Sequence, residues 1–105
     1  MKLLSRKEEL ILLMIYRLGD QAYGISIRDE LERCIGVKYL FGSIYTPLTK
    51  LFDKGLIKKT TSSIESVDGR SRVHFHVTPK GTEALARIKE VNTALWTDIP
   101  PLNMK

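Results

Sequence analysis

Short polar side chains and lysines share one side of a stretch near the middle of the chain. Ile44, Leu48 and Leu51 stand at helical spacing and mark the side that faces a core. The opposite side and its edges then carry Ser43, Tyr45, Thr46, Thr49, Lys50, Asp53 and Lys54. Short hydroxyl side chains let a helix approach a major groove and hydrogen-bond to base edges or phosphates. We therefore expect Ser43, Thr46 and Thr49 to reach base edges, and the two lysines to contact phosphates.

More cations follow in a segment with β-strand composition. Residues 56–63 and 72–77 are rich in β-branched and aromatic residues, and the segment between them contains the turn dipeptide Asp68-Gly69. This hairpin carries Lys58, Lys59, Arg70 and Arg72. Residues 50–80 hold seven basic and three acidic side chains, a local charge of +4 within a net charge of +5. Such a concentration suits a polyanionic partner, although it also serves solubility.

Metal, redox and catalytic chemistry find little support. His74 and His76 are two residues apart and share one face of a strand. A zinc site needs further ligands, which the neighbouring sequence lacks, so we expect no metal. Cys34, the single cysteine, excludes an intramolecular disulfide and is expected to be buried. There is no glycine-rich phosphate loop, nucleophile elbow or HExxH motif, so we expect neither an enzyme nor a cofactor. Because no apolar run is long enough to span a membrane, a cytoplasmic location is expected.

The elements that position these residues follow from periodicity and punctuation. A capping box of Ser5 and Glu8 opens a helix over 6–18, and Gly19 ends it. Further helices are predicted over 24–35 and 42–54, and Thr78-Pro79 opens a last one that runs to about Leu95. In the second strand Val73, Phe75 and Val77 form the apolar face. The fold class is thus mainly α with a small β-hairpin.

The first helix carries more apolar surface than one small domain covers. Residues 10–16 are seven consecutive apolar or aromatic positions, which surround the whole helix. We expect this surplus to pair with the last helix across a two-fold axis, although a later helix of the same chain is an alternative cover. The interface candidates are Leu10, Leu13, Met14, Leu85, Ile88, Val91 and Leu95. Trp96 lies just beyond them, and either packs in the interface or lines a ligand pocket.

Three helices, a two-stranded hairpin and a fourth helix form the layout of a winged helix-turn-helix. Residues 42–57 resemble the recognition helix of the PadR-like family of transcriptional regulators, and residues 69–81 resemble its wing. Ala22-Tyr23-Gly24-Ile25 is a third match. The resemblance is to the compact branch with a short C-terminal region. It implies one winged-helix domain over 1–96 that includes the dimerisation helix. Pro100-Pro101 forbids continuation of the last helix, so we expect a loose tail over 97–105.

The resemblance also implies roles and partners. It favours a phosphate contact for Tyr45, for which packing beside Phe52 is the alternative. By their charge and their place in the hairpin, Arg70 and Arg72 are the expected wing contacts. The expected function is a sequence-specific DNA-binding repressor, acting as a homodimer on a near-palindromic operator and released by a small-molecule effector. The ligand itself is not identified by any residue. The alternative is a winged-helix module that binds a protein, with Tyr39, Phe41 and Phe52 as exposed anchors.

Overall fold

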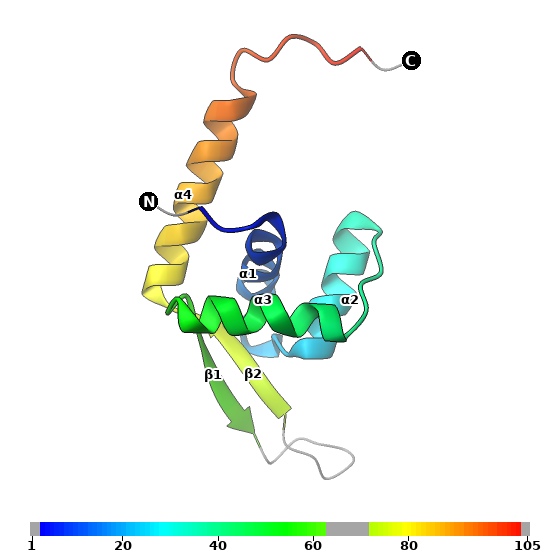
Figure 1. Cartoon of the computed structure of the whole chain (residues 1–105), viewed down its shortest axis with the longest axis vertical. Helices are drawn as coiled ribbons and strands as arrows, with labels where there is room; N and C mark the ends of the chain where they lie inside the picture. Colours follow the sequence, from blue (N-terminus) through cyan, green and yellow to red (C-terminus); the bar gives the residue numbers. More distant parts are fainter. Residues whose placement is uncertain (1–2, 63–71, 104–105) are drawn as a thin grey trace.

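The order of elements agrees with the sequence prediction. The structure, a computed structural model, describes residues 3–62 and 72–103. Its elements are α1 (Arg6–Leu18), the short 3-10 helix η1 (Gly19–Gln21), α2 (Gly24–Ile35), α3 (Gly42–Asp53), β1 (Ile57–Ser62), β2 (Arg72–Val77) and α4 (Pro79–Trp96) (Figure 1). The predicted Asp68-Gly69 turn and Arg70 lie outside the described residues.

The helices begin where the capping residues predict. The Ser5 hydroxyl accepts a hydrogen bond from the Glu8 amide, and the Glu8 carboxylate accepts one from the Ser5 amide. Gly19 ends α1 with a φ of 57°, a conformation that favours glycine. Thr78 caps α4 by accepting from the Gly81 amide at 3.1 Å, and α4 continues to Trp96, one residue further than predicted.

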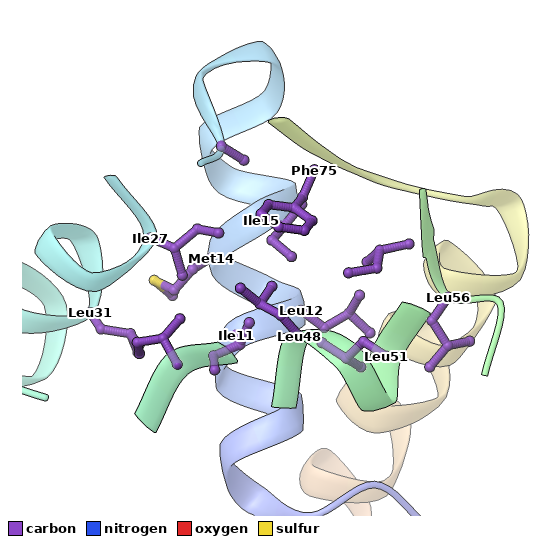
Figure 2. Packing of buried hydrophobic residues seen from close by; sticks show 13 residues of the cluster. Ile11, Leu12, Met14, Ile15, Ile27, Leu31, Leu48, Leu51, Leu56 and Phe75 are labelled. Atoms are coloured by element: carbon purple, nitrogen blue, oxygen red, sulfur yellow. The ribbon is translucent and has the colours of Figure 1, made fainter. Parts of the chain in front are cut away.

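The core lies around α1, which is covered on more than one side (Figure 2). Buried residues of α1 pack with Ile27 and Leu31 of α2 and with the apolar side of α3. Met14 was expected on a surface for a second subunit, and this is wrong: it is 4% exposed and lies beside Ile27. The reason is that α2 covers this side of α1. Leu13 and Tyr16, by contrast, stay exposed.

The wing is joined directly to the helices. β1 and β2 pair antiparallel from Ile57–Val77 to Ser62–Arg72. The Phe75 amide donates to the Ala22 carbonyl at 2.8 Å, so β2 is held on its other edge by the chain entering α2. Phe75 is buried, but Val73 is 40% exposed, which corrects its placement on the core face. The strand has passed the edge of the core at that point.

Two segments extend beyond the core. Cys34, expected to be buried, is exposed, because the last turn of α2 continues past the buried pair Ile27 and Leu31. The C-terminal half of α4 projects away from the other helices (Figure 1), and there Leu95 and Trp96 are 64% and 65% exposed.

Among the described residues, no helix is both long enough and apolar enough to cross a membrane.

Candidate nucleic-acid interface

The exposed side of α3 carries the predicted polar residues. Thr46, Thr49 and Lys50 are exposed, while Ile44, Pro47, Leu48 and Leu51 of this helix face the core. The half-buried Ser43 differs, because its hydroxyl donates to the Leu40 carbonyl at 2.7 Å. Its hydrogen is therefore engaged, and Ser43 can only accept from a base or amino group while that bond persists. The two threonines are the better candidates for base contacts.

A hollow with aromatic walls separates α3 from the wing. It has a volume of about 350 Å³ and is lined by residues of α2, α3 and both strands. The Arg72 guanidinium lies 4.4 Å from the centre of the Tyr23 ring at this hollow, and the Lys59 ammonium lies 4.1 Å from that of Phe52. No acidic side chain lines it among the described residues. Lys59 and Arg72 of the wing thus lie over aromatic rings, on the side of the wing that faces α3.

Tyr45 packs against Phe41, and this contact replaces the predicted alternative beside Phe52. The two rings meet edge to face with centroids 5.0 Å apart. Gly24 makes room for them, because a Cβ there would lie 3.0 Å from the tip of the Phe41 ring and 3.3 Å from the Tyr45 hydroxyl. Tyr45 remains 47% exposed, with its hydroxyl beside Gly24 at the start of α2.

Two of the three aromatic residues proposed as protein-binding anchors are less exposed than that alternative requires. Phe41 and Tyr39 are both half-buried, which corrects their description as exposed anchors. The connection from α2 to α3 folds back so that Phe41 lies against Tyr45 and Tyr39 against the core. Phe52 is 40% exposed, with the Lys59 ammonium over its ring.

A second hollow lies on the other flank of α3. Its volume is about 310 Å³, and α1 and α3 line it with Ser5, Lys7, Glu8, Ser43, Thr46, Pro47 and Lys50. Lys7 was not a candidate from the sequence, where its only signal was its charge. Its ammonium lies 4.9 Å from the centre of the Tyr39 ring. The fold brings Lys7 beside the recognition helix.

Lys54, expected to contact a phosphate, is engaged within the protein. Its ammonium donates to the Glu8 carboxylate at 3.0 Å, and Glu8 is 4% exposed. Burial raises the pKa of Glu8, but hydrogen bonds from Ser5 and Lys54 outweigh it, so the net pKa lies below the ordinary value. Moving Lys54 to DNA would leave a buried carboxylate unpaired. Its role is therefore to join the C-terminal end of α3 to the start of α1.

Replacing Glu8 by glutamine is expected to lower stability by about 1–2 kcal/mol at neutral pH, since Lys54 loses its partner. Because the folded-state pKa of Glu8 lies below its unfolded value, the carboxylate contributes stability above the unfolded pKa and loses it as the pH falls through the folded pKa. Urea unfolding between neutral pH and about pH 3 measures both effects. If the free energy of unfolding of Glu8→Gln fell between neutral pH and about pH 3 as much as that of wild type, this assignment would be contradicted.

The two histidines are placed separately. The His74 ring meets Tyr23 edge to face at 5.6 Å, while His76 Nε2 lies 3.2 Å from the Thr60 hydroxyl. Among residues 3–62 and 72–103, no group of three or more potential ligands is placed to hold a metal ion. His74 thus contacts the residue before α2, and His76 contacts the other strand of the wing.

A larger apolar groove runs between α1 and α4. It has a volume of about 630 Å³ and its lining includes Leu10, Leu13, Tyr16, Leu85 and Ile88. These residues include four of the candidates for a subunit interface, whereas Met14 is in the core. All residues that line the groove belong to α1 and α4, whose places in the fold Figure 1 shows.

Comparison with known proteins decides the family. Residues 11–87 match the model of the transcriptional regulator PadR-like family. The chain belongs to this family. The match runs from the core of α1 to the first half of α4, so it includes the recognition helix and the wing. This PadR-like chain is accordingly a transcriptional regulator with a winged-helix fold, in a family whose members are not enzymes.

Solved structures support the fold. A PadR family transcription regulator from Clostridium difficile R20291 is 24% identical, with a TM-score of 0.73 over 87% of this chain and 91% of that one. A PadR-like transcription factor from Bacteroides fragilis is 25% identical, with a TM-score of 0.69 over 86% and 85%. F93 from STIV, a winged-helix DNA-binding protein, is 18% identical, with a TM-score of 0.71 over 94% and 100%. No curated protein matches the sequence.

Proposed function

We propose that this PadR-like regulator is a sequence-specific repressor that binds double-stranded DNA as a homodimer. The observation that carries the proposal is the surface of α3, with exposed threonines along its centre and cations on its flanks. Such a helix fits a major groove, where short side chains read base edges and lysines neutralise phosphates. Tyr45 donates its hydroxyl to the DNA backbone from the edge of the same surface.

The wing supplies the second half of the DNA contact. Lys58, Lys59 and Arg72 are exposed, and among the described residues none of them forms an ion pair with a carboxylate. Their positive charge is therefore available to a polyanion. Arg72 and Lys59 lie closest to α3 and track the backbone beside the groove that the recognition helix enters. Arg70, outside the described residues, is proposed to extend this contact at the wing.

The dimer forms through α1 and α4. Leu13 is 42% exposed and Tyr16 58% exposed at the groove between these helices, and the outer half of α4 exposes Leu95 and Trp96. Water contact with so many large apolar side chains is unfavourable, and burial against a second copy removes it. A two-fold dimer then presents two recognition helices to half-sites about one helical turn, or a multiple, apart.

Release by a small molecule fits this arrangement. The groove between α1 and α4 lies where a ligand would change the position of one subunit relative to the other, and with it the spacing of the recognition helices. We propose that Trp96 packs in the subunit interface near such a site. Binding of the dimer over a promoter then represses transcription, and the effector relieves it.

Alanine at Lys50 or Arg72 is expected to reduce the slope of log affinity against log salt by about 0.9 each, because each removes one phosphate contact. The measurement is a fluorescence-anisotropy titration of a duplex from the region upstream of the protein's own gene, with a scrambled duplex as reference. Wild-type protein should bind the upstream duplex more tightly, and each variant should lose affinity for both duplexes.

Equal and weak binding of wild type to both duplexes would contradict sequence-specific recognition. In that case binding to a protein partner becomes the better explanation. Thr49→Ala serves as the matched test of base readout, because it removes a hydroxyl and no charge. This variant should reduce the difference in affinity between the upstream and the scrambled duplex, and it should leave the salt slope unchanged.

A further inference from the structure

Cations lie on both flanks of the recognition helix, and they come from different parts of the fold. On the wing flank they are Lys59 and Arg72, at the hollow with aromatic walls. On the opposite flank they are Lys50 of α3 and Lys7 of α1, at the second hollow. A helix inside a major groove has a phosphate backbone on each side of it. The arrangement therefore offers one set of cations to each wall of the groove.

Lys7 is held in place for such a contact. Its ammonium lies 4.9 Å from the centre of the half-buried Tyr39 ring, which itself packs against the core. Among residues 3–62 and 72–103, Lys7 forms no ion pair with a carboxylate. A lysine supported by a fixed ring loses less side-chain entropy on binding than a free one. Lys7 is thus a positioned cation that no carboxylate in the described part of the chain neutralises.

Glu8 also lines this hollow, but its charge is already compensated. One carboxylate oxygen accepts from the Lys54 ammonium at 3.0 Å, and the other accepts from the Ser5 amide at 2.8 Å. The side chain is nearly inaccessible to solvent. The remaining polar groups are hydroxyls, and the exposed Thr46 makes no hydrogen bond in the described part of the chain. The hollow therefore combines Lys7 and Lys50, which pair with no carboxylate among the described residues, with the Thr46 hydroxyl. Two such cations and a hydroxyl donor suit a phosphate.

We propose that this hollow seats the DNA backbone on the α1 side of the recognition helix, with Lys7 as a phosphate-contacting residue. The inference rests on the proposed DNA binding and extends it from the helix-turn-helix and wing to α1. It assigns α1 two roles, since its outward residues Leu10, Leu13 and Tyr16 line the α4 groove while its first turn contacts DNA. Direct contact by α1 fixes the angle between the dimer and the DNA.

Arg6 provides a matched control for the test. It precedes Lys7 on the same helix, carries the same charge and lines the groove toward α4 instead, where its guanidinium pairs with the Glu9 carboxylate at 3.5 Å. Lys7→Gln, Arg6→Gln and Lys7→Arg are compared with wild type by anisotropy on one mixed-sequence duplex. Titrations run between about 50 and 200 mM salt. Sedimentation velocity confirms that each variant has the oligomeric state of wild type.

Lys7→Gln is expected to bind about three- to tenfold more weakly and to reduce the salt slope by about 0.9. Arg6→Gln should keep the wild-type slope, and Lys7→Arg should restore both affinity and slope. If Lys7→Gln and Arg6→Gln behave alike while wild type binds DNA, the α1 contact is overturned and the DNA-binding proposal stands. If wild type itself shows no salt-dependent binding, the DNA-binding proposal fails and the α1 contact fails with it.

Discussion

Replacing Gly81 by alanine is expected to destabilise the protein by about 3 kcal/mol or more. A Cβ at this position would lie 2.1 Å from the Leu56 carbonyl oxygen and 2.7 Å from a Val77 methyl group. The carbonyl cannot easily move, because it accepts a hydrogen bond from the Thr78 amide at 3.0 Å and belongs to a buried residue. Relief requires α4 to shift away from the start of β1, which breaks the packing that holds this helix.

Urea unfolding followed by circular dichroism measures the loss, and Gly42→Ala is its control. A Cβ at Gly42, in the first turn of α3, meets nothing within 4 Å. Alanine there should leave stability unchanged or raise it by up to about 1 kcal/mol. A Gly81→Ala variant with the unfolding midpoint of wild type would contradict the close contact between α4 and the wing.

Glutamate in place of Leu13 is expected to raise the dissociation constant of the dimer at least about 100-fold. Leu13 is 42% exposed in the single chain, so the substitution leaves the core of the protomer intact. In the proposed dimer the same side chain is covered, and a buried unpaired carboxylate is strongly unfavourable. Loss of the dimer also uncouples the two half-site contacts, which lowers apparent affinity for a two-site operator by about 10²-fold or more.

Sedimentation equilibrium gives the dissociation constant, and Leu40→Glu is the matched control. Leu40 is 83% exposed and lies in the connection between α2 and α3, far along the chain from the groove residues. It makes the same chemical change at a site with no role in the proposed interface. A Leu13→Glu protein that remains dimeric would exclude α1 from the interface, whatever the effect on DNA binding.

Local patterns were sufficient for the elements and for the exposed side of the recognition helix. The spacing of Ile44, Leu48 and Leu51 predicts which side of α3 is buried, and the structure confirms it. The capping box of Ser5 and Glu8 likewise predicts the start of α1. These features depend on residues three or four positions apart, whose relation the helix itself determines. Family membership followed from the same stretches of sequence.

The same patterns could not assign partners to individual cations. Lys54 and Lys50 both lie beside the polar side of α3, yet Lys54 is paired with Glu8, which lies 46 residues earlier in the chain. Lys7 was missed for the converse reason, because its position beside α3 depends on how α1 crosses that helix. Seven consecutive apolar residues in α1 likewise do not show that Met14 faces α2 while Leu13 faces outward.

The sequence by itself determined the helices, the wing, the polar side of α3 and the family. Only the tertiary structure decided which lysines form ion pairs within the protein, which apolar side chains remain exposed, and how closely α4 approaches the wing. Secondary structure and amphipathic faces arise from hydrogen bonds and contacts between near neighbours in the chain. Charge pairing and burial arise from residues that only the packing of separate elements brings together.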